Sequence, residues 1–437
     1  MNFSKIPVLR SVYNRYKSDI NSLENKISVL SQENINLRFK IKKLNNEKIK
    51  VVFLCHRPAV WGSLKTVYEA MKSDEKFNVT IVTLPNKKQL PKLGLNHETY
   101  ETEGAEEFWK GSDVISGYNY DKKEFIALNE LKPDYVFIQQ PYNILKPDLL
   151  KSSNISSFAK VCYVPYFTFL ANKENNLVNE QCNPSDFLKD LSMYFTQSPE
   201  NTNYIKSRIS TIPSSRCKVI MSGNPCFDYL NKKIEYDDSN WNFPGDNSKF
   251  RIIWTPRWCL DEGNCNFFEY KDLLPNYCIS SINIDFIFRP HPQAFSNWLI
   301  TGMLSKKEIE EYKKLYEQAR NIKIDIQKDY IKTFNSSDCL VTDISSIIPE
   351  YFLTGKPIIY CHKKGSINSF IKNKGYTAGF YWVENWNELK TTLDMLRSGN
   401  DPLKEKRKEL IKSEFYVPND GAGYFIKEEI KNDFINS

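Results

Sequence analysis

A regular alternation of short apolar runs and helical stretches, which begins at Ile49, most constrains how this chain can fold. The runs are rich in β-branched and aromatic residues, which is typical of buried strands. Strands that alternate with helices form mostly parallel, doubly wound sheets. The predicted strands are residues 50–55, 79–84, 135–139, 160–164, 194–197 and 218–221 in a first series, and 250–255, 284–288, 322–326, 339–342, 357–361 and 379–383 in a second.

The two series are separated by a polar segment rich in Asp, Asn, Gly and Pro, a composition typical of a linker. A chain of 437 residues is also too long for one ordinary hydrophobic core. The predicted fold class is therefore α/β, with two Rossmann-like doubly wound domains that face a cleft. We place the first domain at residues 49–230, the linker at 231–249 and the second domain at 250–437.

Residues 1–48 precede the first domain and contain an unbroken heptad pattern, which indicates an N-terminal coiled-coil helix. One seam position holds Ile20, Ile27, Asn34, Ile41 and Lys48, and the other holds Leu23, Leu30, Leu37 and Leu44. Ile at the first position with Leu at the second favours a parallel two-stranded coil, and a single Asn fixes its register. We predict a homodimer through residues 20–48. A single long helix packed on its own domain is the alternative.

Polar side chains follow the strands of the second series, at the sheet edge where ligands bind in open α/β folds. Ser345 and Ser346 lie between the strand at 339–342 and an apolar helical run, so their hydroxyls could hold a phosphate. Asp343 or Ser345 could equally cap that helix without a ligand. Glu350, one turn into the helix, could accept hydrogen bonds from ribose hydroxyls, although an exposed helical glutamate is the simpler interpretation.

His291 lies between two prolines directly after the strand at 284–288. The prolines restrict the backbone, which indicates a positioned side chain. An imidazole there can donate to a phosphate oxygen or protonate a leaving group near neutral pH. Arg289, or Arg257 at the end of the preceding strand, could neutralise a diphosphate through its planar guanidinium group. A surface ion pair is the alternative for each arginine.

His56 directly follows the first strand of the first domain and is the candidate general base there. A hydrogen-bonded structural histidine is the alternative. The chain has no GxGxxG, Walker A or GxSxG sequence, so the usual support for NAD-dependent, ATP-hydrolysing and serine-hydrolase functions is missing. No histidine is spaced with a cysteine or another histidine as zinc requires, and we predict neither a metal nor a cofactor.

Several motifs, taken in order along the chain, resemble those of the bacterial CDP-glycerol glycerophosphotransferases, which polymerise teichoic acids and related capsule backbones. These motifs are Gly223-Asn-Pro-Cys-Phe-Asp228, Trp254-Thr-Pro-Arg257, Arg289-Pro-His-Pro292, Thr342-Asp-Ile-Ser-Ser346, Lys356-Pro357 and Asn419-Asp-Gly421. The ordered set is far more specific than any one motif.

This resemblance implies a GT-B fold, in which the second domain binds a nucleotide donor and the first domain binds the acceptor. It also implies attack of an acceptor hydroxyl on the phosphate next to glycerol, with CMP leaving, and that Arg289, His291, Ser345 and Ser346 grip the donor diphosphate. Together with the candidates found from the residues themselves, the predicted catalytic residues are His56 and His291. The predicted donor-binding residues are Thr255, Arg257, Arg289, His291, Asp343, Ser345, Ser346 and Glu350.

The first domain departs from the family pattern, because a family histidine that is thought to act as base has no counterpart here. The corresponding segment resembles Cys162-Tyr-Val-Pro-Tyr-Phe167, which contains no histidine. Either His56 takes over the role of base or the chain transfers a group other than glycerol phosphate.

Other sequence features bear on location and partners. The ten cysteines are scattered without a CxxC pair, which favours buried thiols in a reducing compartment. The N-terminus lacks the apolar core of a signal peptide. We expect a cytoplasmic protein, at most peripheral at the inner face of the membrane. The expected partners are a CDP-activated donor and a polysaccharide or glycerophosphate acceptor, not nucleic acid. An inverting glycosyltransferase and a non-catalytic assembly scaffold remain alternatives.

Overall fold

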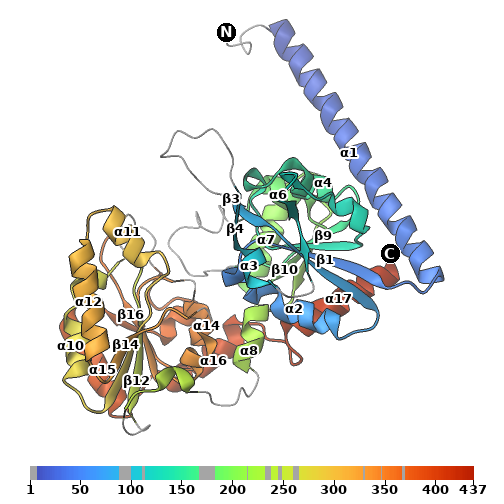
Figure 1. Ribbon diagram of the computed structural model, residues 1–437. Helices are drawn as coiled ribbons and strands as arrows, with labels where there is room; N and C mark the ends of the chain where they lie inside the picture. The colour runs from blue at the N-terminus through green and yellow to red at the C-terminus, as the bar shows by residue number, and fades with distance from the viewer. Residues whose placement is uncertain are drawn as a thin grey trace.

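Two parallel β-sheets, one in each half of the chain, organise the molecule (Figure 1). The computed structural model describes residues 7–87, 100–110, 114–166, 183–213, 215–231, 238–244, 249–258, 265–327, 330–345, 347–366 and 370–437. Within these residues, every helix is too short or too polar to span a bilayer.

The first sheet has the strand order β11-β10-β9-β8-β1-β2-β5, and all neighbouring strands are parallel. Its strands are β1 (Ile49–Cys55), β2 (Phe77–Thr83), β5 (Ile115–Ser116), β8 (Tyr135–Ile138), β9 (Lys160–Tyr163), β10 (Met193–Thr196) and β11 (Lys218–Met221). One face packs on α2 (Gly62–Lys72), and the other packs on α4 (Ser152–Ile155), α6 (Ser185–Asp190) and α7 (Pro199–Ser210). Two short hairpins, β3–β4 (Pro85–Lys87, Tyr100–Gly104) and β6–β7 (Tyr118–Asn119, Glu124–Phe125), lie in the connections.

The second sheet has the strand order β14-β13-β12-β15-β16-β17 and is also parallel throughout. Its strands are β12 (Phe250–Thr255), β13 (Ile284–Phe288), β14 (Ile322–Ile324), β15 (Cys339–Thr342), β16 (Ile358–Cys361) and β17 (Tyr381–Val383). One face packs on α9 (Phe267–Tyr270), α10 (Leu273–Ile279), α11 (Ala294–Ile300), α12 (Lys306–Gln318) and α15 (Trp386–Arg397). The other packs on α13 (Ile331–Asn335), α14 (Ile348–Phe352), α16 (Lys404–Glu414) and the 3-10 helix η8 (Gly375–Gly379).

Most strands of both sheets are buried, because helices cover both faces of each sheet. This burial explains why the strands read as nearly continuous apolar runs. The α/β fold class is therefore confirmed, and β11, β12, β13 and β15 have the predicted bounds. The other predicted strands differ from the structure by no more than two residues at either end.

The predicted linker is partly built into the second domain. Residues 239–241 form the 3-10 helix η7 (Ser239–Trp241), and Trp241 is buried in the core between the second sheet and α13. The Nε1–H group of Trp241 donates to the carbonyl oxygen of Thr333 over 3.3 Å. Residues 232–237 and 245–248 of the predicted linker lie outside the described residues.

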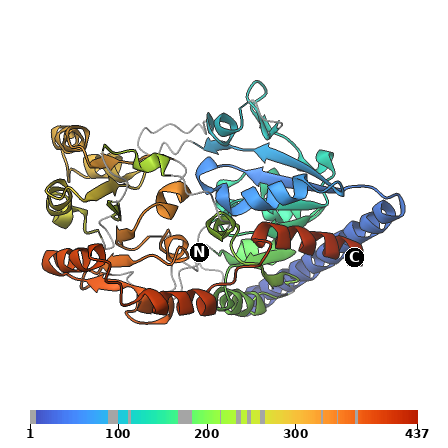
Figure 2. The same cartoon turned by 90° about the horizontal axis from the view of Figure 1, so that it is seen from below.

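The last helix, α17 (Ala422–Asn436), returns to the first domain. Its side chains Ile426, Ile430 and Phe434 are buried in the same core as β1 and α2. Figure 2 shows α17, in red, beside the C-terminal part of α1. This helix therefore contributes to the core of the first domain, although the sequence boundary had assigned it to the second.

Asp228 holds the start of α17 in place. Its carboxylate accepts hydrogen bonds from the backbone N–H groups of Ala422 (2.6 Å) and Gly423 (2.9 Å) and from the hydroxyl of Thr66 (2.6 Å). Gly421 has a φ of +88°, and a Cβ atom there would lie 3.0 Å from the Asp228 carboxylate. Both the backbone conformation and the space therefore require glycine at this position.

The N-terminal helix α1 (Pro7–Leu44) packs on the first domain only through its C-terminal part. Ile35 and Phe39 are buried there, with the Phe39 ring centroid 4.9 Å from that of Phe434. Lys42 Nζ lies 2.6 Å from Asp134 Oδ2. The rest of α1 extends away from both domains in Figure 1. The long helix is as the heptad pattern predicted up to Leu44, but Lys48 lies beyond its end, directly before β1. Its pairing with a second copy stays a prediction.

Asp433, on α17, is the centre of an ion-pair network in the first domain, in which Asp433 and Lys160 are buried and Lys218 is exposed. Its two carboxylate oxygens lie 2.6 Å from Nζ of Lys160 and of Lys218, and Tyr135 donates to it over 2.9 Å. Burial opposes ionisation, but the two lysines hold the pKa of Asp433 below its usual value.

We predict that Asp433→Asn destabilises the first domain, because it leaves the buried ammonium group of Lys160 without a counterion. The free energy of unfolding at neutral pH should fall by about 3 kcal/mol, measured from the urea midpoint of the first domain. A carboxylate with a lowered pKa stabilises the fold above its unfolded pKa of about 3.9 and loses this effect as the pH falls through the folded value. The gap between wild type and variant should therefore close in strong acid. Exposed Asp121→Asn is the control and should change stability by less than about 0.5 kcal/mol; a similar change in both variants would contradict the prediction.

Candidate functional site

The carboxyl ends of β12 and β15 form the topological switch point of the second sheet. The chain adds β13 and β14 on one side of β12, and then returns to add β15, β16 and β17 on the other. Loops that leave the sheet in opposite directions open a crevice at such a point, where α/β proteins bind ligands. The last residues of the two strands, Thr255 and Thr342, are partners in the register, and their buried hydroxyls hydrogen-bond over 2.8 Å.

Asp343, directly after β15, fixes the loop that follows β12. Its carboxylate accepts hydrogen bonds from the backbone N–H of Arg257 (3.0 Å), the backbone N–H of Asn266 (2.9 Å) and the side-chain amide of Asn266 (2.7 Å). Burial raises the pKa of Asp343 to about 6, although these donors favour the ionised form. Because protein donors occupy its oxygens, Asp343 is suited to positioning Arg257 at the switch point.

Ser345 lies before α14 rather than at its N-cap. The helix begins at Ile348 with Ile347 as its N-cap residue, and Pro349 lies in its first turn. Proline favours that place because the first helical N–H groups have no intrahelical partner. The half-buried Ser345 accepts a hydrogen bond from the N–H of Ile347 over 3.4 Å. Ser346 lies outside the described residues.

His291 presents one ring nitrogen to its surroundings. Its side chain reaches the surface, and its ring is partly covered by Trp258, on which it stacks with a centroid distance of 5.2 Å. Nδ1 accepts a hydrogen bond from the N–H of Gln293 over 3.2 Å. Nε2 of the neutral ring then carries the proton, because one nitrogen of a neutral imidazole donates and the other accepts. Partial burial and the nearby Arg257 lower the pKa of His291, which favours this neutral form.

Arg289 is held by the protein itself. Its Nη1 atom lies 2.6 Å from Asp325 Oδ2, and Nη2 donates to the carbonyl oxygen of Gln327 over 2.7 Å. The guanidinium carbon lies 5.2 Å from the ring centroid of Tyr330. Asp325 therefore balances much of this charge, and Arg289 would share it with an incoming anion rather than supply a full positive charge.

Glu350 is buried between the two domains and is not the exposed helical residue of the simpler interpretation. It accepts a hydrogen bond from the hydroxyl of Tyr330, and burial raises the pKa of Glu350 to about 7. Glu350 also lies near Cys226, which follows β11 of the first sheet. Burial is the main cause of the raised pKa of the Cys226 thiol, and the negative charge of Glu350 raises this pKa further. Glu350 of the second domain therefore lies close to the segment that follows β11 of the first.

His56 lies at the switch point of the first sheet, between β1 and β8. Gln139, directly after β8, accepts hydrogen bonds from the N–H groups of His56 (2.7 Å) and Arg57 (3.0 Å). Burial, followed by Arg57 and Lys146, lowers the pKa of His56 to about 3. Its imidazole is therefore neutral at any pH near neutrality.

The structure thus gathers those predicted donor residues that it describes at one edge of the second sheet, and it places His56 at the corresponding edge of the first. Sequence reasoning missed Gln139 and Asn266, which hold the turns that carry His56 and Arg257. Gln139 directly follows β8 and Asn266 directly precedes α9, and these positions were the available signal. Within the described residues, no group of three or more His, Cys, Asp or Glu side chains could hold a metal ion.

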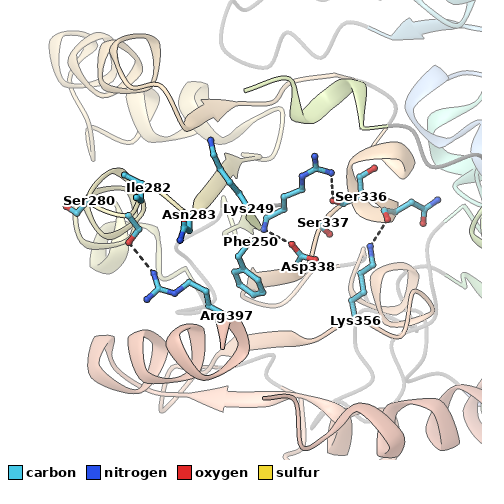
Figure 3. Close-up of a pocket in the computed structure, with 13 residues that line it drawn as sticks. Lys249, Phe250, Ser280, Ile282, Asn283, Ser336, Ser337, Asp338, Lys356 and Arg397 are labelled. Carbon is cyan, nitrogen blue, oxygen red and sulfur yellow. Dashed lines mark hydrogen bonds between the residues drawn. The ribbon is translucent and has the colours of Figure 1, made fainter. Parts of the chain in front are cut away.

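A hollow of about 1060 Å³ lies at the opposite edge of the second sheet (Figure 3). It is lined by residues at the amino ends of the strands, including Arg251 of β12 and Asp338 before β15. Its cations already have protein partners: Lys356 Nζ donates to the carbonyl oxygen of Asn335 over 2.6 Å, and Arg251 to that of Ser336 over 3.2 Å. The hollow is therefore separate from the donor residues and contains none of them.

Two Rossmann-like domains, each built on a parallel sheet, define a fold of the GT-B type. Residues 213–375 match the family model of CDP-glycerol:poly(glycerophosphate) glycerophosphotransferase, which confirms the relationship expected from the motifs. Over this part the chain is related to these transferases, which marks it as an enzyme of the glycerophosphotransferase type.

Solved structures share the fold at low sequence identity. The wall teichoic acid polymerase TagF is 16% identical, with 98% of each chain covered and a TM-score of 0.56. A TagF variant soaked with CDPG is 17% identical, with 99% of this chain and 98% of that chain covered and a TM-score of 0.55. UDP-GlcNAc 2-epimerase from Neisseria meningitidis, bound to UDP-GlcNAc, is 14% identical, with coverage of 89% and 100% and a TM-score of 0.54. Comparison with curated protein sequences gives no match.

We predict that Glu350→Gln changes the pH dependence of stability. The folded chain holds the Glu350 proton up to a pKa of about 7, against an ordinary value of 4.5. The wild type therefore loses stability as the pH rises between these values, whereas glutamine has no proton to lose and keeps an oxygen for Tyr330. The free energy of unfolding of the variant, relative to wild type, should rise by up to about 3 kcal/mol between pH 5 and pH 8. The exposed residue Glu409 supplies the control, Glu409→Gln, whose difference from wild type should not change with pH; a constant difference for Glu350→Gln would refute the assignment.

Proposed function

We propose that this enzyme transfers glycerol phosphate from CDP-glycerol to a hydroxyl group of a surface-polymer acceptor and releases CMP. The observation that carries this proposal is the family match over residues 213–375. Those residues include β12, β13 and β15, together with every predicted donor residue that follows them. The edge that fold topology marks for a ligand is therefore the part of the chain related to CDP-glycerol transferases.

The second domain would hold the donor diphosphate. Nε2–H of His291 is available to donate to a phosphate oxygen, and Arg257 supplies positive charge next to it. Ser345 offers a half-buried hydroxyl at the same edge, and Ser346 was predicted to do so. Glu350 would accept a hydrogen bond from a ribose hydroxyl. Thr255 would form the floor of the donor site, and Asp343 would hold the loop that carries Arg257. Arg289 would add a positive charge that it shares with Asp325.

The reaction needs positioning and charge neutralisation more than covalent chemistry. The acceptor oxygen forms a bond to the phosphorus that carries glycerol, and the bond from this phosphorus to the bridging oxygen breaks. CMP leaves with the bridging oxygen, and the Nε2–H group of His291 stabilises the negative charge on it by donating a hydrogen bond. The acceptor hydroxyl gives its proton to a base, for which we propose His56.

The setting of His56 supports this role in one respect and limits it in another. Burial, Arg57 and Lys146 keep the imidazole unprotonated, so it is ready to accept a proton. The same surroundings make it a weak base. A transferase that uses His56 as its base therefore depends on the exact placement of the acceptor hydroxyl beside the imidazole. This dependence is consistent with a first domain that lacks the family's own histidine.

We expect the purified chain to release CMP from CDP-glycerol when a glycerophosphate-bearing acceptor is present. Product formation should be followed by anion-exchange chromatography of the nucleotides and by mass spectrometry of the acceptor. Release of UDP from UDP-sugars, with CDP-glycerol inactive, would show a nucleotide-sugar glycosyltransferase instead. Inactivity with both donors, together with no binding of CMP, would favour a non-catalytic scaffold.

We predict that His291→Ala lowers kcat/KM for CDP-glycerol by about 100-fold, because a donor to the phosphate is lost. His291→Gln, which retains an N–H donor, should recover part of this loss. The matched control is Gln293→Ala, because the exposed Gln293 contacts His291 through its backbone N–H group. It should change kcat/KM less than twofold. Equal losses in His291→Ala and Gln293→Ala would indicate a structural role for the loop and contradict the assignment of His291.

A further inference from the structure

Helix α1 carries an apolar seam that its own domain does not cover. The central seam residues are mostly solvent-accessible: Leu23 is 58% exposed, Ile27 61%, Leu30 59%, Leu37 55% and Ile41 57%. Ile20 and Leu44, at the two ends, are exposed as well. A stripe of exposed leucine and isoleucine side chains along one side of a long helix marks an interaction surface.

A different side of α1 contacts the first domain. The buried residues Ile35, Phe39 and Lys42 follow the i, i+4, i+7 spacing of one helical face. At 3.6 residues per turn, this face lies roughly 150° around the helix from the middle of the seam. Packing on the domain and pairing through the seam therefore do not compete.

The residue pattern of the seam indicates which kind of partner binds to it. It is narrow, with two apolar positions in each heptad, whereas a helix that lies on a membrane needs a wide apolar face. It is also interrupted by exposed Asn34, a polar residue that is satisfied when it meets a copy of itself across a two-fold axis. Ile at one seam position and Leu at the other fit a parallel pair of strands.

We propose that a second copy of this chain covers the seam, and that the two α1 helices form a parallel two-stranded coiled coil over residues 20–44. The first domains would then lie on the outer sides of the coil and at the same end of it. Each is braced to its helix, since Arg38 donates to the carbonyl oxygen of Pro133 over 2.7 Å and Lys43 to that of Ile435 over 2.9 Å. The dimer would present two donor sites in one particle.

The mass of the full chain in solution tests the pairing. The wild type should have twice the chain mass of 51.2 kDa by light scattering at micromolar concentration. The double variant Ile27→Glu, Leu30→Glu, which places charges in the seam, should have the single-chain mass. The control Asn25→Glu, Ser28→Glu adds the same charge at exposed positions outside the seam and should remain dimeric. Equal masses for wild type and seam variant would overturn the proposal.

Cross-linking tests the orientation. In a parallel coil the two copies of residue 27 face each other, so Ile27→Cys should form an intermolecular disulfide under mild oxidation. Ser28→Cys and the wild type should not. A dimer in which Ile27→Cys fails to cross-link would overturn the parallel arrangement. Circular dichroism and the urea midpoint of the first domain should be unchanged in all variants. A monomeric wild type that instead binds vesicles of anionic phospholipid would assign the seam to lipid and overturn the pairing.

Discussion

The parallel pairing of β12 with β15, with Thr255 opposite Thr342, is the contact on which the site in the second domain depends. The strands that follow β12 and β15 are added on opposite sides of this pair, so the connections diverge at its carboxyl end. Asp343 then ties the two connections together through the N–H groups of Arg257 and Asn266. Strand order and register therefore determine where the donor residues lie, and the loop sequences adjust the position of each side chain.

The ionisable side chains at the carboxyl edge of the second sheet differ in how much charge they offer to a ligand. Arg289 is already paired with Asp325, whereas the neighbouring His291 is neutral and directs one N–H group outward. Burial raises the pKa of Glu350 to about 7, so this carboxyl group is protonated in about half of the molecules at neutral pH. Protonation reduces the repulsion that Glu350 would otherwise exert on a diphosphate, whereas Asp343 stays mostly ionised and is compensated by its N–H donors. The edge of the sheet is thus less acidic near neutral pH than its sequence suggests.

The sheets could be predicted from sequence because buried parallel strands are nearly continuous apolar runs, whose ends are set by polar residues. Four strands have the predicted bounds for this reason: β11, β12, β13 and β15. The donor residues that directly follow strands could be predicted on the same basis. The positions that could not be predicted depend on tertiary contacts. The burial of Glu350 arises only in the folded chain, where Tyr330 donates to its carboxyl group. Gln139 follows a strand, but its partners are backbone N–H groups that the sequence does not identify. The packing of α17 on the first domain could not be predicted for the same reason, since its apolar face could pack on either domain.

The chain crosses between the domains twice, once after Asp228 and once before Gly421, and the Asp228 carboxylate joins the two crossings through Ala422 and Gly423. Two connections that are joined at one point restrict how the domains can be displaced: any displacement that separates the connections would break the hydrogen bonds of Asp228. The tight fit of Gly421 against the Asp228 carboxylate holds both connections at that point.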